Sequence, residues 1–194
     1  MGFFDAIMGR SQPKQANLDA LFGVPAAAIT LQTALGFEPT GSAAVCYRGT
    51  AGAGMAGAQR DMTELISGGV DAPQVTTSTD SYGFSWLQVQ RTGGPQADVA
   101  GLVTDLHAVN TTLEAEGFGP ALLCSVVVFA DAGGRRVGLV YLYKQGTFYP
   151  FSPQAGTDRR DNLLEIQVRD AVSGELPVEP DLQRWLAIWG APGL

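Results

Sequence analysis

Histidine and cysteine are scarce in this chain of 194 residues, which contains one histidine and two cysteines. A zinc site with two histidine ligands is therefore excluded within one chain, and no CxxC pair is present to replace it. Cys46 and Cys124 cannot build a disulfide framework, so we interpret them as reduced, buried thiols of a cytoplasmic protein. We predict neither a metal site nor a cofactor.

Charge is scarce as well. Charged residues make up 16% of the chain, and the formal net charge is -7. An acidic chain is repelled at long range by nucleic-acid phosphates and by anionic lipid, so we predict no nucleic-acid partner. No apolar run approaches the roughly 20 residues that span a bilayer, and the longest, from Ala121 to Ala130, has the length of a strand. The start of the chain lacks the basic lead and long apolar stretch of a secretory signal.

The first 16 residues have the pattern of a short amphipathic appendage. Phe3, Phe4, Ile7 and Met8 would share one face of a two-turn helix, and a polar linker with a proline follows. A helix this short is marginal in water and needs a surface to fold against. That surface is either the protein's own domain, a partner helix or a membrane, and the pattern leaves these alternatives open.

Apolar periodicity and turn residues predict the elements of the remaining chain, residues 17–194. The clearest is a helix over 98–116, whose apolar stripe holds for more than four turns before Gly117. Helices are also expected over 25–35, 55–66 and 161–172, although the alternation of apolar residues over 27–35 also permits a strand. Strands are expected over 43–48, 74–79, 84–91, 122–130, 136–143 and 147–151.

Several of these strands are joined by short turns, which favours antiparallel pairing. We therefore predict a single α+β domain with a mainly antiparallel sheet and helices packed largely on one face. A short internal echo accompanies this pattern, because Gly36-Phe37-Glu38-Pro39 and Gly117-Phe118-Gly119-Pro120 each end an expected helix and precede an apolar strand. The echo fits either a duplicated unit or the same capping chemistry used twice.

The segment Gly52 to Gly57 reads GAGMAG, a literal GxGxxG between an expected strand and an expected helix. It suggests an alternative function, a small nucleotide-binding protein or enzyme with Asp80 as the ribose-binding acid. Three observations oppose it: a spacer precedes the first glycine, Asp80 lies further along than the usual distance of about 20 residues, and the chain then turns into a hairpin. A flexible loop leading into a helix is the favoured interpretation.

His107 and the two cysteines allow a further hypothesis, a Cys–His nucleophilic pair that uses Cys124 or Cys46. No orienting acid or amide is fixed by spacing, and neither cysteine has a nucleophile signature around it. Asn110 is unusual because it falls within the apolar stripe of the long helix, where a buried amide must find hydrogen-bond partners.

Two arginine pairs, Arg135-Arg136 and Arg159-Arg160, flank an aromatic segment that includes Tyr149. Arginine beside exposed aromatic side chains is typical of protein-interaction hot spots and of surfaces that bind single-stranded RNA. The acidic net charge of this chain favours a protein partner over RNA. The alternative is that the aromatic residues are core and the arginines a solvated rim.

Several blocks of the sequence resemble one family. MGFFDAIMGR at the start, GLVTDLHAVNTTLE over 101–114, GFGPALLCSVVVF over 117–129, LVYLYKQGTFYPF over 139–151 and WGAPGL over 189–194 are similar to the PspA-associated protein PspAB family of actinobacteria. The resemblance covers nearly the whole chain. It implies an accessory, non-enzymatic partner of PspA, the membrane-binding coiled-coil protein of the phage-shock envelope stress response.

From the residues and the resemblance together we expect a cytoplasmic interaction protein, with peripheral contact at the inner face of the cell membrane. The residues expected to contact the partner are those of the appendage and of the arginine pairs with their aromatic neighbour: Phe3, Phe4, Ile7, Met8, Arg135, Arg136, Tyr149, Arg159 and Arg160.

Overall fold

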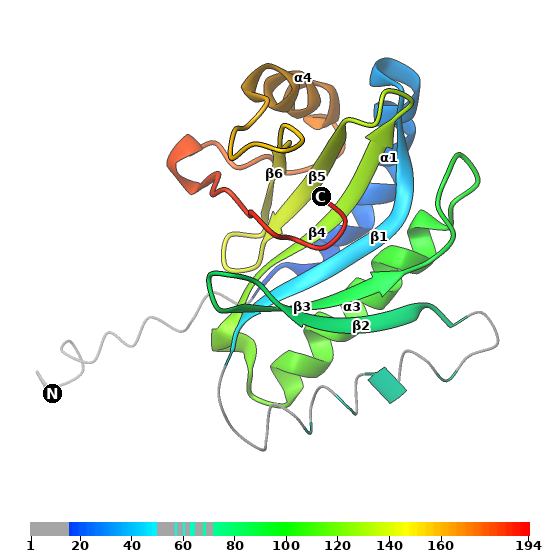
Figure 1. Ribbon diagram of the computed structural model, residues 1–194. Helices are drawn as coiled ribbons and strands as arrows, with labels where there is room; N and C mark the ends of the chain where they lie inside the picture. Colours follow the sequence, from blue (N-terminus) through cyan, green and yellow to red (C-terminus); the bar gives the residue numbers. More distant parts are fainter. Residues whose placement is uncertain (1–15, 50–56, 58–59, 61–62, 65–67, 69–71) are drawn as a thin grey trace, which may run out of the picture.

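The sheet at the centre of the fold has six strands in the order β2-β3-β1-β4-β5-β6, and every neighbouring pair is antiparallel (Figure 1). The structure is a computed structural model, which describes residues 16–49, 57, 60, 63–64, 68 and 72–194. The α+β class expected from the sequence is confirmed. The strands are β1 (Phe37–Arg48), β2 (Gln74–Thr79), β3 (Phe84–Gln90), β4 (Leu122–Asp131), β5 (Arg136–Leu142) and β6 (Thr147–Phe151).

The described helices are α1 (Val24–Thr30), α3 (Val99–Ala115) and α4 (Asn162–Val172). Asp98 and Asp161 cap α3 and α4, since each carboxylate accepts a backbone N–H from the first turn. Helices α3 and α4 follow the sequence-based prediction closely, whereas the helical stretch expected to begin at Pro25 already begins at Leu18. Of the helix expected over 55–66, most residues lie outside the described part of the chain.

Strand β1 is longer than the predicted strand over 43–48, because it begins at Phe37 directly after Gly36. The register with β4 shifts between Pro39 and Ala43, and Gly41 lies within this irregularity with a φ of 74°. Pro39 itself stays in register with Phe129 of β4, but β3 pairs with β1 only from Ser42 onward. At Pro39 the strand therefore has a neighbouring strand on one side only, as at a sheet edge, where a proline is tolerated.

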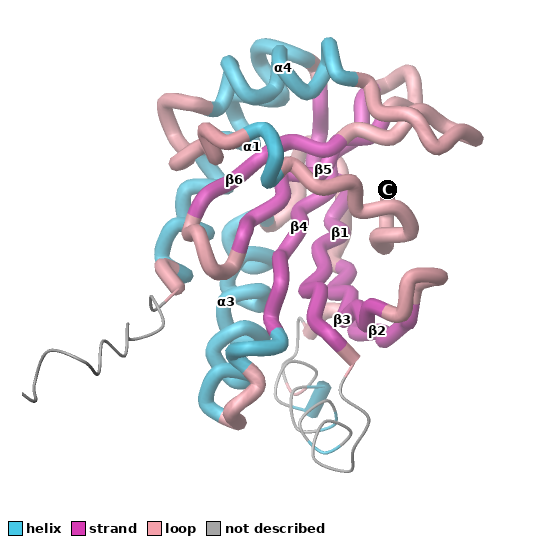
Figure 2. Tube along the Cα trace, turned by 90° about the vertical axis from the view of Figure 1, so that its left-hand side faces the viewer, coloured by secondary structure: helices cyan, strands magenta, loops and turns pink. Residues whose placement is uncertain are grey.

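The two faces of the sheet are covered differently (Figure 2). The helices pack on one face, where the larger core contains Leu31 of the N-terminal helical stretch, Leu106 of α3 and Val168 of α4. On the other face a smaller core forms between the strands and the segment after α4, residues 177–194, which we call the tail segment. Helices on one face, as predicted, therefore leave the second face to irregular chain.

Residues Leu18–Leu35 form one continuous helical stretch that joins η1 (Leu18–Gly23), α1 and η2 (Leu31–Leu35). It ends at Gly36, whose φ of 72° provides the left-handed cap expected there. With 18 residues and a mean hydropathy of 1.4 it is long and apolar enough to cross a membrane, although a soluble core helix meets the same criterion. Its inner face does lie in the core, through residues such as Leu21, Val24 and Leu31.

The echo seen in the sequence corresponds to two similar corners. Gly36 and Gly117 both have positive φ, and the chain passes from each into a central strand, β1 or β4. These two strands pair with each other. After β4 the chain turns straight back into β5, whereas β1 is followed by the edge strand β2, so the two halves share a corner but not a connectivity.

Candidate interaction surface

The two arginine pairs, far apart in the sequence, come together at one end of the sheet. Arg135 and Arg136 lie at the turn between β4 and β5, and Arg159 and Arg160 lie between β6 and α4. Pairing of β5 with β6 brings these connections side by side, and the Ser152 hydroxyl donates to the Arg136 carbonyl at 2.7 Å. The pairs that flank the aromatic segment in the sequence are thus also neighbours in space.

A hollow of about 640 Å³ opens between these connections. Arg135 and Arg136 line it, together with residues 152–157, Asp161 and Leu194. Arg135 forms an ion pair with Asp131 at 2.7 Å but keeps 57% of its side chain exposed. Arg136 donates to the carbonyl of Gly193, and Arg159 is exposed. Three of the four arginines therefore remain accessible to a partner.

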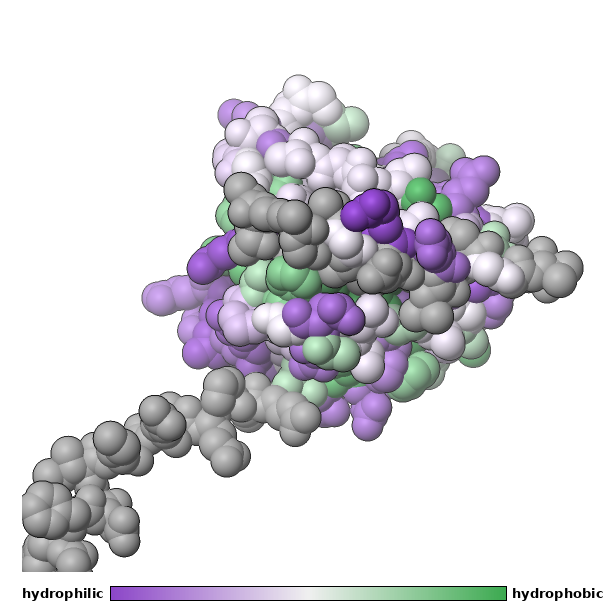
Figure 3. All heavy atoms as spheres, turned by 90° about the horizontal axis from the view of Figure 1, so that it is seen from below, coloured by the Kyte–Doolittle hydropathy of each residue, from purple (hydrophilic) through white to green (hydrophobic). Residues whose placement is uncertain are grey.

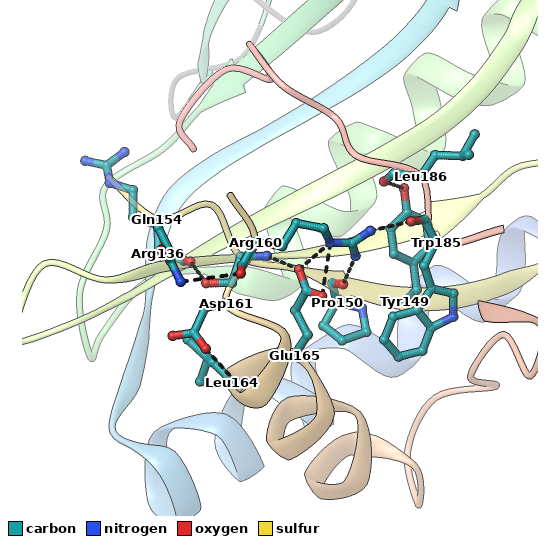
Figure 4. Close-up of polar contacts among 11 residues, drawn as sticks. Arg136, Tyr149, Pro150, Gln154, Arg160, Asp161, Leu164, Glu165, Trp185 and Leu186 are labelled. Carbon is teal, nitrogen blue, oxygen red and sulfur yellow. Dashed lines mark hydrogen bonds and ion pairs between the residues drawn. The ribbon is translucent and has the colours of Figure 1, made fainter. Parts of the chain in front are cut away.

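Arg160 lies inside the protein and holds three elements together (Figure 4). Its Nε donates to both carboxylate oxygens of Glu165 on α4, at 2.9 and 3.1 Å. The guanidinium also donates to the carbonyls of Pro150 in β6 and Trp185 in the tail segment. Only 20% of its side chain and 3% of that of Glu165 are exposed. Arg160 accordingly has a structural role, and the sequence did not reveal it because Glu165 looked like an ordinary helix residue.

Tyr149 is not on the surface, contrary to the expectation of an exposed aromatic side chain. It is 1% exposed, and its ring stacks on Trp185 with 6.0 Å between the centroids. Its hydroxyl donates to the carbonyl of Leu186 at 2.8 Å. Alternation along β6 points this ring toward the tail segment, so the interpretation of the aromatic residues as core is the correct one.

The apolar residues of the appendage, Phe3, Phe4, Ile7 and Met8, lie outside the described residues, and their role stays a prediction. The helical stretch that follows them has an exposed side that the sequence pattern did not indicate. Phe22 is 49% and Ile29 is 65% exposed. Ala26 and Thr33 are exposed as well, at helical spacing from these two. We call Phe22, Ala26, Ile29 and Thr33 the outer face of the N-terminal helix.

At Phe22 the outer face borders α3. Phe22 packs against His107 of α3 with 5.1 Å between the ring centroids, and His107 lies 3.8 Å from Asp19. The described surface seen from below in Figure 3 is a mixture of hydrophobic residues, coloured green, and hydrophilic residues, coloured purple. A partner could thus reach both the exposed apolar residues of the outer face and the accessible arginines beside the hollow.

The Cys–His hypothesis does not fit the geometry. Cys46 and Cys124 belong to the core on the tail side of the sheet, whereas His107 lies on α3 on the helix side. The sheet separates the histidine from both thiols. Cys46 and Cys124 face each other directly across β1 and β4, and both are almost fully buried, at 4% and 7% exposed.

We expect the two thiols to react slowly with iodoacetamide in the folded protein at pH 8, at least a hundredfold more slowly than in denaturant. The hydrogen bond with Cys124, followed by burial, raises the pKa of Cys46, and the neutral thiol is a poor nucleophile. Folding therefore holds a proton on Cys46 that the unfolded chain loses above about pH 8.5. Stability is unaffected below that pH and falls above it.

Burial also raises the pKa of Tyr141 to about 12, which extends this loss of stability above about pH 10. Urea unfolding between pH 7 and 10.5 measures the effect, and mass spectrometry after timed alkylation measures the reactivity. Fast labelling of the folded protein at pH 8, or unfolding free energies that stay constant across this range, would contradict the assignment of neutral, buried groups.

The nucleotide hypothesis loses its main structural support. The chain after β2 forms a hairpin with β3, so the sheet has no parallel crossover at this point, although a dinucleotide fold requires one. The Asp80 carboxylate is already occupied, because it accepts N–H groups from Tyr82, Phe84 and the Trp86 indole. Most of the segment Gly52 to Gly57 lies outside the described residues.

Asn110 is buried as its position in the stripe implied; its Nδ2 group is bonded within the fold, while its Oδ1 accepts no hydrogen bond from the described residues. The amide donates to the Leu106 carbonyl one turn earlier, at 2.8 Å, and to the Ser125 hydroxyl on β4, at 3.0 Å. The amide thus ties α3 to a central strand.

Together these observations define an α+β protein with an antiparallel sheet, a cationic rim and an apolar helix side, whose histidine lies apart from both thiols. A family model described as PspA associated protein B, PspAB, matches residues 1–193, and the chain belongs to this family. The family resemblance found in the sequence is thereby confirmed. Comparison with curated proteins and with solved structures gave no match.

Proposed function

We propose that this protein is a non-enzymatic accessory protein that binds a protein partner at or near the membrane, and that PspA is this partner. The family carries association with PspA in its name. The structural observation that supports the proposal is the outer face of the N-terminal helix, on which Phe22 and Ile29 are exposed.

This outer face suits a helical partner. Burying a large apolar side chain stabilises a complex by about 1.5–3 kcal/mol, so Phe22 and Ile29 are suitable anchors. Small residues at Ala26 and Thr33 leave room between them for the ridge of a second helix. A coiled-coil protein, which the resemblance implies PspA to be, presents helices of this kind.

The appendage extends the proposed contact. In the sequence, Phe3, Phe4, Ile7 and Met8 precede the helical stretch by a short linker and are apolar like the exposed residues of the outer face. We assign them to the same partner, with peripheral contact at the inner face of the cell membrane as the alternative that the experiment separates. Arg135, Arg136 and Arg159 are assigned to a second contact with acidic residues of the partner.

The test is binding of purified PspA to the full chain, measured by calorimetry or biolayer interferometry. We expect Ile29→Asp to weaken binding at least tenfold, because a carboxylate would be buried at the interface, and deletion of residues 1–12 to weaken it as well. Leu182→Asp is the matched control, since Leu182 is 60% exposed and belongs to the tail segment, which packs on the other face of the sheet. All three variants should keep unfolding free energies within about 1 kcal/mol of the parent, as surface changes do.

Equal binding of the parent and of Ile29→Asp would overturn the proposed surface. A charge reversal, Arg135→Glu with Arg136→Glu, tests the second contact in the same assay. Flotation with vesicles that contain anionic phospholipid distinguishes the membrane alternative, because that alternative requires the deletion to abolish flotation while binding of PspA is unchanged.

A further inference from the structure

An apolar pocket lies on the face of the sheet opposite the outer face of the N-terminal helix. It has a volume of about 620 Å³ and opens between the strands and the tail segment. Cys46 and Cys124 lie on its strand side with Trp86, and Leu186, Ile188 and Trp189 line it from the tail segment. We call this cavity the tail pocket.

The polar groups that line the tail pocket are mostly used by the protein itself. The Tyr149 hydroxyl donates to the Leu186 carbonyl, and the Trp86 indole donates to Asp80. The thiols of Cys46 and Cys124 are in contact with each other. An occupant would therefore meet hydrocarbon, aromatic rings and sulfur, which accept an aliphatic chain and give a polar group no partner.

Arg48 is the cation that lines this pocket. It ends β1, is exposed, and forms no ion pair with any residue that the structure describes. Asp80 also lines the pocket, but its oxygens already accept three N–H groups. A guanidinium beside an apolar cavity, with no ion-pair partner among the described residues, matches a ligand with an anionic head and a hydrocarbon tail.

We infer that the tail pocket binds one long-chain carboxylic acid, with the alkyl chain against Trp86, Cys124 and Ile188 and the carboxylate on Arg48. The volume lies within the range of about 300–1,000 Å³ that is usual for small-molecule sites. This site is separate from the proposed contact with PspA, since it lies on the other face of the sheet.

The experiment uses the full chain and the fluorescent probe 11-(dansylamino)undecanoic acid, with displacement by dodecanoate below its micellar concentration. We expect saturable dansyl fluorescence, displacement by dodecanoate, and no displacement by dodecyltrimethylammonium at the same concentration. In partly destabilising urea, Cys124 should be alkylated more slowly with dodecanoate present than with dodecyltrimethylammonium present, because the alkyl chain of bound dodecanoate covers that thiol.

Arg48→Glu should weaken dodecanoate about tenfold, as loss of a charge-assisted hydrogen bond does. Arg159→Glu is the matched control, because it makes the same change in charge on an exposed arginine that does not line the tail pocket. A third variant, Ala187→Trp, places a ring at the exposed edge of the pocket and should lower probe binding while leaving the unfolding free energy unchanged.

Three results would overturn the inference: no saturable probe binding, equal weakening by Arg48→Glu and Arg159→Glu, or displacement by the cationic and anionic amphiphiles alike. A parallel binding experiment with vesicles of anionic phospholipid tests whether the alkyl chain comes from a free acid or from a membrane lipid. Binding to vesicles without any binding of monomeric dodecanoate would likewise count against a pocket for a free acid.

Discussion

Arg160→Ala is expected to lower the free energy of unfolding by about 3–5 kcal/mol, the usual cost of removing one partner from a buried ion pair. The Glu165 carboxylate would remain, almost fully buried, with the backbone N–H of Ser152 as its neighbour at 2.8 Å. The carbonyls of Trp185 and Pro150 would lose their donor as well. Urea denaturation followed by tryptophan fluorescence measures the change.

Two controls make this expectation specific. Arg135→Ala breaks an ion pair of comparable length on an exposed side chain, and should cost less than about 1 kcal/mol. Arg160→Met combined with Glu165→Gln removes both charges, and should recover at least half of the loss because no buried charge is left unpaired. A loss for Arg160→Ala no larger than that for Arg135→Ala would show that Glu165 is solvated in the folded protein.

Gly41→Ala is expected to cost about 3 kcal/mol or more, because two effects act at the same position. The backbone has a φ of 74°, which a side chain disfavours. A Cβ atom there would also lie 2.1 Å from the carbonyl oxygen of Arg91. The Arg91 N–H donates to the Gly41 carbonyl at 2.8 Å, so the two backbones cannot separate without losing this bond.

Gly156→Ala separates the two effects. Gly156 has a φ of 72°, but no atom of the described residues lies within 4 Å of the position that a Cβ would take, so only the conformational cost of about 1–2 kcal/mol applies. The difference between the two variants in urea unfolding reports the close approach at the β1 bulge. Equal losses would mean that the loop after β3 moves aside without cost.

The elements that could be predicted from the sequence are those whose signals are local. The helix at 99–115 has a long apolar stripe and ends before Gly117, and the β2–β3 hairpin has its turn residues in place. The start of β1 could not be predicted, because Pro39 argues against a central strand, and only the pairing shows that β3 does not extend to this proline.

The candidate surface was only partly predictable for a related reason. Proximity of Arg136 and Arg160 follows from hairpin pairing of neighbouring strands, which the sequence suggests. The tail segment decides which side chains on the face that it covers are buried. Its packing against the sheet could not be predicted, because its sequence has no apolar periodicity of a helix or strand. Tyr149 and Arg160 were therefore expected at the surface and are covered, while the exposure of Phe22 has no signal in the sequence because its neighbours Leu18, Leu21 and Val24 are core residues.

The way the tail segment closes the second face of the sheet has a consequence for biosynthesis. Residues such as Val126, Val140 and Phe151 are covered by chain that leaves the ribosome after every strand has been made. Until then one side of a nearly complete sheet presents aliphatic and aromatic side chains to solvent, and nascent intermediates of this kind are prone to aggregation. Chaperones that shield hydrophobic surface during translation would therefore act on this protein for as long as residues 177–194 are still inside the exit tunnel.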